Sequence, residues 1–398
     1  MKKIILLPLL AIFILNAQNS YINQILILNE GYLDFSSDSI IEPVTIGSYD
    51  IAADTYSDVI TIEGAKFASD LIIEGDFFYV AADNRVNKYD LNTYELISTS
   101  IIEGARKLAI YNDYLFVSKG DYDPLTFGPV LFDSYLDVYD LNLDYLFGFP
   151  TTNGPQFSTE NIIIENNKLY ILINNAYEWG NYQGIVGIIN LNDMSYQDEI
   201  SLGDDGKNPV NLMKKDGKLY TTNNKNWDGG SVSVINTNTN DVQTLNLSDI
   251  SFGCGVSVLR ENKINYQESG GSDMKILNLE TLAENGVEGN LNLNFYAVSE
   301  NPINGNLYAS TSDFVTNSSV IIYNENNFEI NSFTSGVTTN KIVFDVRTEN
   351  NSSISENYIG QNKSHRFDIL GGLTNNSRGI QLNVTESGDI TKSLIIKQ

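Results

Sequence analysis

Two short patterns of apolar and polar positions recur along this chain. In the first, an apolar strand meets a tight turn of Asn, Asp or Gly, and the next strand carries Tyr or Phe, as in residues 71–80 and 162–171. In the second, an alternating strand ends in Asp or Asn and a turn, as in residues 136–142. Short strands bounded by turn residues account for both patterns, and helical periodicity of any length is absent. The chain is therefore predicted to be an all-β protein.

The second pattern repeats at a nearly constant interval. Its closing residues are Asp50, Asp90, Asp140, Asn190, Asn236, Asn278 and Asn324, in steps of 40, 50, 50, 46, 42 and 46 residues. Seven units of about 45 residues match the length of a four-stranded propeller blade. The repeat predicts a seven-bladed β-propeller. The alternatives, a β-sandwich or a β-helix, fit less well, because sandwich strands do not repeat in this way and β-helix coils are far shorter.

One strand remains after the seventh unit, at residues 342–346. The first strand of the chain, residues 24–28, can pair with it in one blade and close the ring. A blade cannot bury both faces alone, so a closed ring of blades buries them and leaves only short outer edges. We expect the propeller to span residues 18–347.

The connections within the predicted blades differ in length. The turns between the first and second strands, and between the third and fourth, are uniformly tight. The connections between the second and third strands are long and should gather on one face, where function tends to reside. They comprise residues 30–43, 119–134, 174–184, 223–230, 267–273 and 311–318, whereas blade 2 has only Asp83-Asn84.

These long loops contain most of the candidate ligand-binding residues. Rigid aromatic rings among Asn, Asp and Gly supply contact area at small entropic cost. The candidates are Trp179, Trp227, Tyr182, Tyr177, Tyr122, Phe127 and Tyr32, with Phe35 and Phe314 beside them. The alternative is that each ring packs down its own loop.

A second group of polar residues falls at equivalent starts of the predicted innermost strands, near the central channel. They are Asp70, Arg106, Glu160, Asn211, Ser257 and Tyr296. Such a ring could bind Ca²⁺ or a polar ligand, or only solvate the channel.

Composition narrows the chemistry. The formal net charge of −26 and the absence of a basic patch argue against nucleic-acid binding. Cys254 is the only cysteine, which excludes an intramolecular disulfide and a cysteine zinc site. His365 is the only histidine and lies near the end of the chain, which argues against a Ser-His-Asp hydrolase. No catalytic motif is found, so we assign no catalytic residue and expect the protein not to be an enzyme.

The N-terminal residues 1–17 have the features of a secretory signal. Lys2 and Lys3 precede an apolar run from Ile4 to Leu15, and Ala17 offers a small residue for cleavage. The run is too short to span a bilayer, and no other segment reaches the ~18 apolar residues of a membrane span. We expect an exported protein without a transmembrane segment.

The C-terminal residues differ from the repeat. Residues 348–362 form a polar linker rich in Asn and Ser, and three short strands are predicted at 366–372, 378–384 and 392–398. The Asp368-Ile369-Leu370-Gly371 motif, Gly379-Ile380 and the final basic-apolar strand resemble the C-terminal sorting domain of type IX secretion in Bacteroidetes. The resemblance implies that residues 363–398 engage this secretion machinery and bring the protein to the cell surface. The alternative is a final β-hairpin of the main domain.

A second resemblance concerns the repeat. Residues 25–31, Ala68-Ser69-Asp70-Leu71 and Ala105-Arg106-Lys107-Leu108 resemble the YncE-type propellers of Bacteroidetes surface proteins. The resemblance implies a seven-bladed propeller that works with a TonB-dependent outer-membrane transporter. In one branch of the family it also implies capture of cobalamin. Those members are generally lipoproteins, and this chain has no cysteine after its apolar run.

Three functions follow from these observations. The first is a surface protein that captures a small ligand, with a corrinoid as the narrowest hypothesis. The second is a surface module for adhesion or protein–protein interaction. The third is a Ca²⁺-dependent lactonase- or lyase-like propeller enzyme, in which Asp70, Glu160 or Asn211 would bind one ion.

Overall fold

The computed structural model of the chain describes residues 19–225, 229–247, 251–253, 255–348, 365–367, 379–384 and 390–395. The chain divides into two compact units, one of which spans Asn19–Glu349. That unit contains seven antiparallel sheets of four strands and one 3-10 turn, Asp204–Gly206. Each sheet is one blade, as the repeat predicted.

The strands of each blade follow in order from the innermost to the outermost. Blade 1 comprises β30 (Thr339–Thr348), β1 (Ser20–Asn29), β4 (Val44–Asp50) and β5 (Thr55–Ile62). Blade 2 comprises β6 (Ala68–Glu74), β7 (Phe77–Ala82), β8 (Arg85–Asp90) and β9 (Leu96–Ile101). Blade 3 comprises β10 (Ala105–Tyr111), β11 (Tyr114–Lys119), β12 (Ser134–Asp140) and β13 (Tyr145–Pro150). Blade 4 comprises β14 (Thr159–Glu165), β15 (Lys168–Ile173), β16 (Ile185–Asn190) and β17 (Ser195–Ser201).

The remaining blades have the same plan. Blade 5 comprises β18 (Pro209–Lys215), β19 (Lys218–Asn223), β20 (Gly230–Asn236) and β21 (Val242–Leu247). Blade 6 comprises β22 (Ser257–Arg260), β23 (Lys263–Tyr266), β24 (Lys275–Asn278) and β25 (Ala283–Val287). Blade 7 comprises β26 (Phe295–Glu300), β27 (Leu307–Thr311), β28 (Asn317–Tyr323) and β29 (Glu329–Val337). The innermost strands contact one another in the order β6, β10, β14, β18, β22, β26, β30 and again β6, so the ring is closed.

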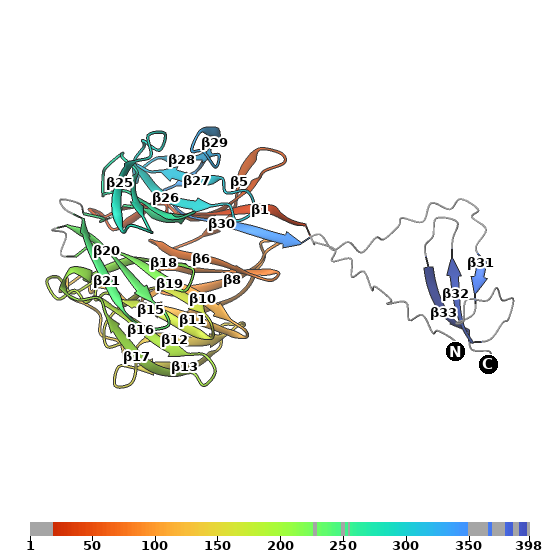
Figure 1. Cartoon of the computed structure of the whole chain (residues 1–398), viewed down its shortest axis with the longest axis horizontal. Helices are drawn as coiled ribbons and strands as arrows, with labels where there is room; N and C mark the ends of the chain where they lie inside the picture. Colours follow the sequence, from red (N-terminus) through yellow and green to blue (C-terminus); the bar gives the residue numbers. More distant parts are fainter. Residues whose placement is uncertain are drawn as a thin grey trace, which may run out of the picture. The chain divides into compact units, whose positions relative to one another are not determined.

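The two ends of the propeller unit share blade 1. The antiparallel pairing of β1 with β30 sets Ile25 opposite Phe344 and Leu28 opposite Lys341, and the two strands lie side by side in Figure 1. This pairing confirms the expected closure by residues 24–28 and 342–346.

The core lies between the blades. The described residues form seven clusters of buried apolar side chains, and each cluster joins two neighbouring blades. Successive residues of one strand serve opposite interfaces: Phe78 packs toward blade 1, and Tyr79 packs toward blade 3. Strand side chains alternate between faces, so a strand buried on both faces reads as a continuous apolar run.

The repeating Asp or Asn has a structural cause. In each blade its side-chain oxygen accepts a hydrogen bond from the amide two residues later, which makes the turn from the third strand to the fourth an Asx turn. The acceptors are Asp50, Asp90, Asp140, Asn190, Asn236, Asn278 and Asn324. The sequence marker is therefore a turn-forming side chain.

The second described part is a three-stranded antiparallel sheet of β31 (His365–Phe367), β32 (Gly379–Val384) and β33 (Ile390–Ile395). Three strands were predicted here, and the bounds of the first and the last differ from the prediction. Residues 1–17 and the motif at 368–371 lie outside the described residues. In the described part of the chain, no helix is long and apolar enough to cross a membrane.

Candidate functional site

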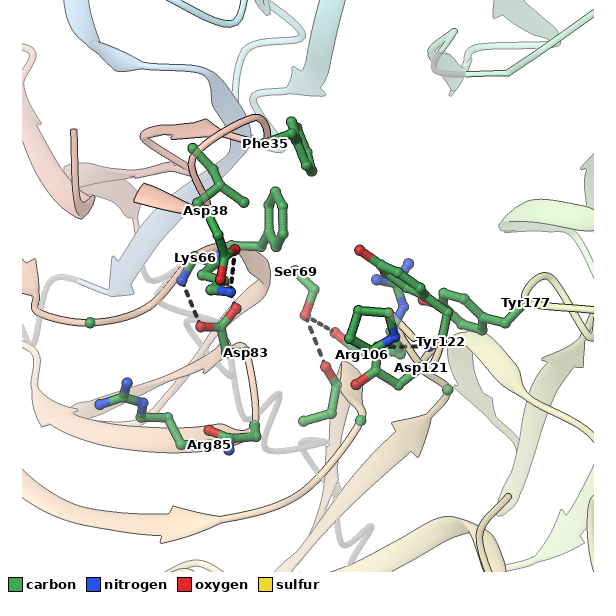
Figure 2. Close-up of a pocket in the computed structure, with 18 of the residues that line it drawn as sticks. Phe35, Asp38, Lys66, Ser69, Asp83, Arg85, Arg106, Asp121, Tyr122 and Tyr177 are labelled. Atoms are coloured by element: carbon green, nitrogen blue, oxygen red, sulfur yellow. Dashed lines mark hydrogen bonds and ion pairs between the residues drawn. The ribbon is translucent and has the colours of Figure 1, made fainter. Parts of the chain in front are cut away.

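Differences in loop length create a cavity on one face of the propeller, above blade 2. There the second and third strands are joined by Asp83 and Asn84 alone, whereas blade 1 inserts a hairpin of β2 (Tyr32–Asp34) and β3 (Ser39–Glu42). Blade 3 contributes a long loop stiffened by a bridge between Tyr122 and Pro129. Because the two-residue turn of blade 2 lies between the longer hairpin of blade 1 and the longer loop of blade 3, an open cavity of about 920 Å³ remains above it. We call it the blade 2 cavity (Figure 2).

Aromatic side chains from the loops of blades 1, 3 and 4 and from the link between blades 1 and 2 line the blade 2 cavity. Phe35 of the hairpin is 74% exposed and lies 5.9 Å from Phe67, measured between ring centroids. Phe127 and Tyr122 line the cavity from the blade 3 loop, and Phe127 is 80% exposed. Tyr177 lines it from the blade 4 loop. Rings that are already held by separate loops lose little entropy when they bind a ligand.

One ion pair and two hydrogen bonds connect the residues of the cavity wall at blades 1 and 2. The Lys66 ammonium lies 2.6 Å from the Asp38 carboxylate and links the hairpin to blade 2. The Asp83 carboxylate accepts the backbone amides of Lys66 and Phe67, at 2.6 and 3.0 Å. These acids are thus engaged by the protein itself.

Arg106 lines the blade 2 cavity and is paired with Glu160. Its guanidinium donates to Glu160 Oε2 at 3.0 Å and lies 5.6 Å from the ring of Tyr177. Burial is the largest single effect and lowers the pKa of Arg106, but the charge and hydrogen bond of Glu160, together with Tyr177 and Glu30, outweigh it and raise the pKa. Burial also raises the pKa of Tyr177 to about 12, so its hydroxyl stays protonated at neutral pH.

A second cavity, of about 430 Å³, opens at the mouth of the central channel. In six blades the innermost strand has a register shift at this end, immediately after its first pair. A bulge leaves one residue unpaired and re-aims its side chain. The residues so placed that line the channel mouth are Ser69, Lys107, Asn161, Val210, Tyr296 and Asn340.

Two carboxylates at the channel mouth, those of Asp70 and Glu160, form ion pairs. The Asp70 carboxylate accepts the amide of Leu108 at 2.9 Å and lies 2.8 Å from the Lys341 ammonium. The Glu160 carboxylate lies 3.0 Å from Arg106 and 3.7 Å from Lys107. Burial lowers the pKa of Lys107, although Glu160 opposes the shift.

The structure brings together some of the predicted ligand-binding residues. Tyr177, Tyr122 and Phe127 line the blade 2 cavity. Trp179 is 79% exposed on the blade 4 loop and does not line that cavity. Trp227 lies outside the described residues.

Three other predicted aromatics have different positions. Tyr182 is only 4% exposed, which corrects its assignment to an exposed binding face: its ring packs edge-on against Trp179 beneath the loop. Tyr32 is half-buried in β2, while its neighbours Leu33 and Phe35 line the cavity. Phe314 packs edge-on against Tyr296 and lines a separate small cavity.

Sequence reasoning missed residues that reach the sites from other connections. Lys66 and Phe67 come from the link between blades 1 and 2, which opens on the same face as the long loops. Arg85 begins β8, directly after the two-residue turn. The short Asp83-Asn84 connection of blade 2 was the sequence feature that could have located the cavity, because one short connection among long loops leaves space on that face.

The channel residues expected to share one cation have separate partners. Asp70 contacts Lys341, Glu160 contacts Arg106, and Asn211 donates to Ser257 Oγ at 2.8 Å. Within the described ranges, no group of three or more His, Cys, Asp or Glu residues is placed to hold a metal ion.

No protein-family model matches the chain, and no curated protein matches it either. Among solved structures, BamB from Moraxella catarrhalis is similar, with 12% sequence identity over 71% of this chain and 82% of the BamB chain. The TM-score is 0.46. The likeness is one of fold, and the sheet topology itself establishes the seven-bladed propeller.

Proposed function

We propose that this chain is a binding module that captures a small molecule in the blade 2 cavity without converting it. The observation that carries the proposal is the cavity itself, which has a volume of about 920 Å³ and is lined by aromatic rings from the loops of blades 1, 3 and 4 and from the link between blades 1 and 2. Cavities that bind small molecules typically have volumes of about 300–1,000 Å³ and combine apolar walls with a few polar groups.

The walls support a role in binding. The hairpin and the blade 3 loop each have backbone pairing of their own, β2 with β3 and Tyr122 with Pro129, which orders the loops that carry the rings. The Lys66–Asp38 pair and the two amide contacts of Asp83 fix the remaining wall. Preorganisation of this kind lowers the entropic cost of binding.

The test is a fluorescence titration of the full chain with N-phenyl-1-naphthylamine, a neutral dye that brightens in apolar surroundings. We expect saturable binding, and we expect Phe127→Ala to weaken it about tenfold, as loss of a central aromatic contact does. Phe328→Ala is the matched control, because Phe328 is also exposed but lies in the turn that follows Asn324. Absence of binding, or equal loss in both variants, would refute the proposal.

A narrower hypothesis names the ligand and the partner. It proposes that the ligand is cobalamin or a related corrinoid and that a TonB-dependent outer-membrane transporter receives it. Its support is the sequence resemblance to YncE-type propellers. Calorimetry with cobalamin tests it: we expect submicromolar binding that weakens in Phe127→Ala. If the neutral dye binds and cobalamin does not, the corrinoid hypothesis is wrong, while the proposal that the cavity binds a small molecule stands.

A protein partner is the second candidate, because the loop of blade 3 exposes large apolar side chains. Leu125, Phe127 and Leu131 are 88%, 80% and 83% exposed. Exposed apolar residues that lie together on a loop are typical of interaction surfaces. Substitution of Leu125 and Leu131 by Ser separates the two candidates: it should leave dye affinity unchanged and abolish binding to a protein partner.

We also propose that the protein is exported to the cell surface. The support is the signal-like sequence of residues 1–17 and the resemblance of residues 363–398 to type IX sorting domains. Fractionation of cells that express the full chain, or the chain without residues 363–398, tests this. Retention of the full chain in the cytoplasm would contradict it.

A further inference from the structure

Arg85 differs from the other arginines of the propeller. The structure describes the side chains of four arginines, and three of them are ion-paired: Arg106 with Glu160, Arg260 with Glu300, and Arg347 with Asp345. Arg85 makes no side-chain hydrogen bond or ion pair with the described residues, and its Nε is shielded from solvent without a partner. In a chain with 50 acidic and 24 basic residues, an arginine without an acidic partner is unexpected.

Arg85 lies where a ligand in the blade 2 cavity could reach it. It lines the blade 2 cavity at the first residue of β8, and its guanidinium lies beside Gly64. Figure 2 shows it across the cavity from Tyr122 and Tyr177. A buried donor without a partner carries a desolvation cost, which a ligand acceptor would relieve.

Two acids that line the cavity with Arg85 already have partners within the protein. Asp83, two residues before Arg85, accepts two backbone amides, and Asp38 is held by Lys66. The guanidinium fork of Arg85 is therefore free for a planar or tetrahedral group of anionic oxygens, which it can bind through two parallel hydrogen bonds.

We propose that the ligand of the blade 2 cavity carries an anionic oxygen group, a carboxylate or a phosphate, bound by Arg85. The ring or apolar part of the ligand packs among Phe35, Phe67 and Phe127. This inference rests on the proposed function and specifies the class of ligand.

Two dyes with one aromatic system test the inference in the full chain. N-phenyl-1-naphthylamine is neutral, and 8-anilinonaphthalene-1-sulfonate adds a sulfonate that stands in for the anionic group. We expect Arg85→Gln to weaken the sulfonate dye about tenfold, the scale of a charge-assisted hydrogen bond, and to change the neutral dye less than about twofold.

Two further variants separate local contact from overall charge. Lys218→Gln removes the same charge from an exposed site, the first residue of β19, and we expect it to leave the affinity for both dyes unchanged. Arg85→Lys keeps the charge but loses the fork, so we expect an affinity for the sulfonate dye between those of the wild type and Arg85→Gln.

Competition then distinguishes the source of the anionic group. Displacement of the sulfonate dye by 1-naphthoate indicates a carboxylate ligand, and displacement by 1-naphthyl phosphate indicates a phosphate ligand. Failure of both to compete better than 1-naphthamide would overturn the inference.

The outcomes separate this inference from the proposed function. If both dyes bind and Phe127→Ala weakens both, but Arg85→Gln changes neither, the cavity binds ligands and the anion site is wrong. If neither dye binds, the proposed function fails and this inference fails with it.

Discussion

At the scale of single residues, Glu30 shows how burial at the channel mouth changes the pKa of a carboxyl group. Its carboxylate accepts hydrogen bonds from Asn340 Nδ2 at 2.7 Å and from the Tyr296 hydroxyl at 3.1 Å. Burial nevertheless raises its pKa above the ordinary value of 4.5. The folded protein therefore binds this proton more tightly than the unfolded chain does, and the carboxylate charge costs stability at neutral pH.

The residue-scale prediction concerns Glu30→Gln. The stabilisation from the raised pKa is complete below pH 4.5 and disappears as the pH rises through the folded pKa. We therefore expect the variant to melt at a higher temperature than the wild type at pH 7 and to lose this advantage toward pH 4.5. Thermal melts across that range check it, with the exposed Glu103→Gln as control. A lower melting temperature of Glu30→Gln at pH 7 would contradict the assignment.

At the scale of elements, one short connection and one inserted hairpin create the candidate site. The two-residue turn of blade 2 removes a loop, while β2 and β3 raise the wall of blade 1. The hairpin lies outside the β1–β4 ladder, which already begins at Asn29 and Thr45. In blade 1, the β2–β3 hairpin contributes to the candidate site, and the β1–β4 ladder belongs to the blade sheet.

The element-scale prediction replaces residues 31–43 with an Asn-Gly turn that joins Glu30 to Val44. Asn-Gly is favoured in two-residue hairpin turns, so we expect the β1–β4 ladder and the melting temperature to be nearly unchanged. We expect affinity for both dyes to fall at least about tenfold, because the variant lacks Phe35 and the partner of Lys66. Circular dichroism and dye titration check this. Unchanged affinity would place the ligand elsewhere.

At the scale of the whole propeller unit, β30 closes the ring of blades, and we expect stability to depend on it. β30 is the innermost strand of a blade whose other strands come from the opposite end of the propeller unit. It contacts both β26 and β6 and buries Ile342 in the cluster between blades 7 and 1. Each buried aliphatic side chain contributes roughly 1.5–3 kcal/mol of transfer free energy, so loss of this strand exposes two interfaces at once.

The molecule-scale prediction compares two truncations. A chain that ends at Thr338 lacks β30, and we expect it to lose its cooperative thermal transition and to aggregate through the exposed edge of β1. A chain that ends at Glu349 keeps the whole propeller unit, and we expect it to melt cooperatively. A cooperative transition in the shorter chain at the same temperature would show that closure is not required.

The sequence alone determined the architecture, because the turn chemistry of a blade is local. An Asp or Asn at the end of each third strand binds an amide two residues later, so seven such residues reveal seven blades and their connections. The same logic predicted the pairing of the two terminal strands and three of the cavity aromatics, Tyr122, Phe127 and Tyr177.

Only the tertiary structure decided which polar and aromatic residues meet. Tyr182 and Trp179 lie on one loop, yet one is buried and the other exposed, because ring packing within the loop selects between them. Glu30 reaches Asn340, and Phe35 reaches Phe67, only once the blades stand side by side. The missing partner of Arg85 Nε is likewise a property of what surrounds it in space, since no local rule along the chain reports that Asp83 and Asp38 are held by other groups.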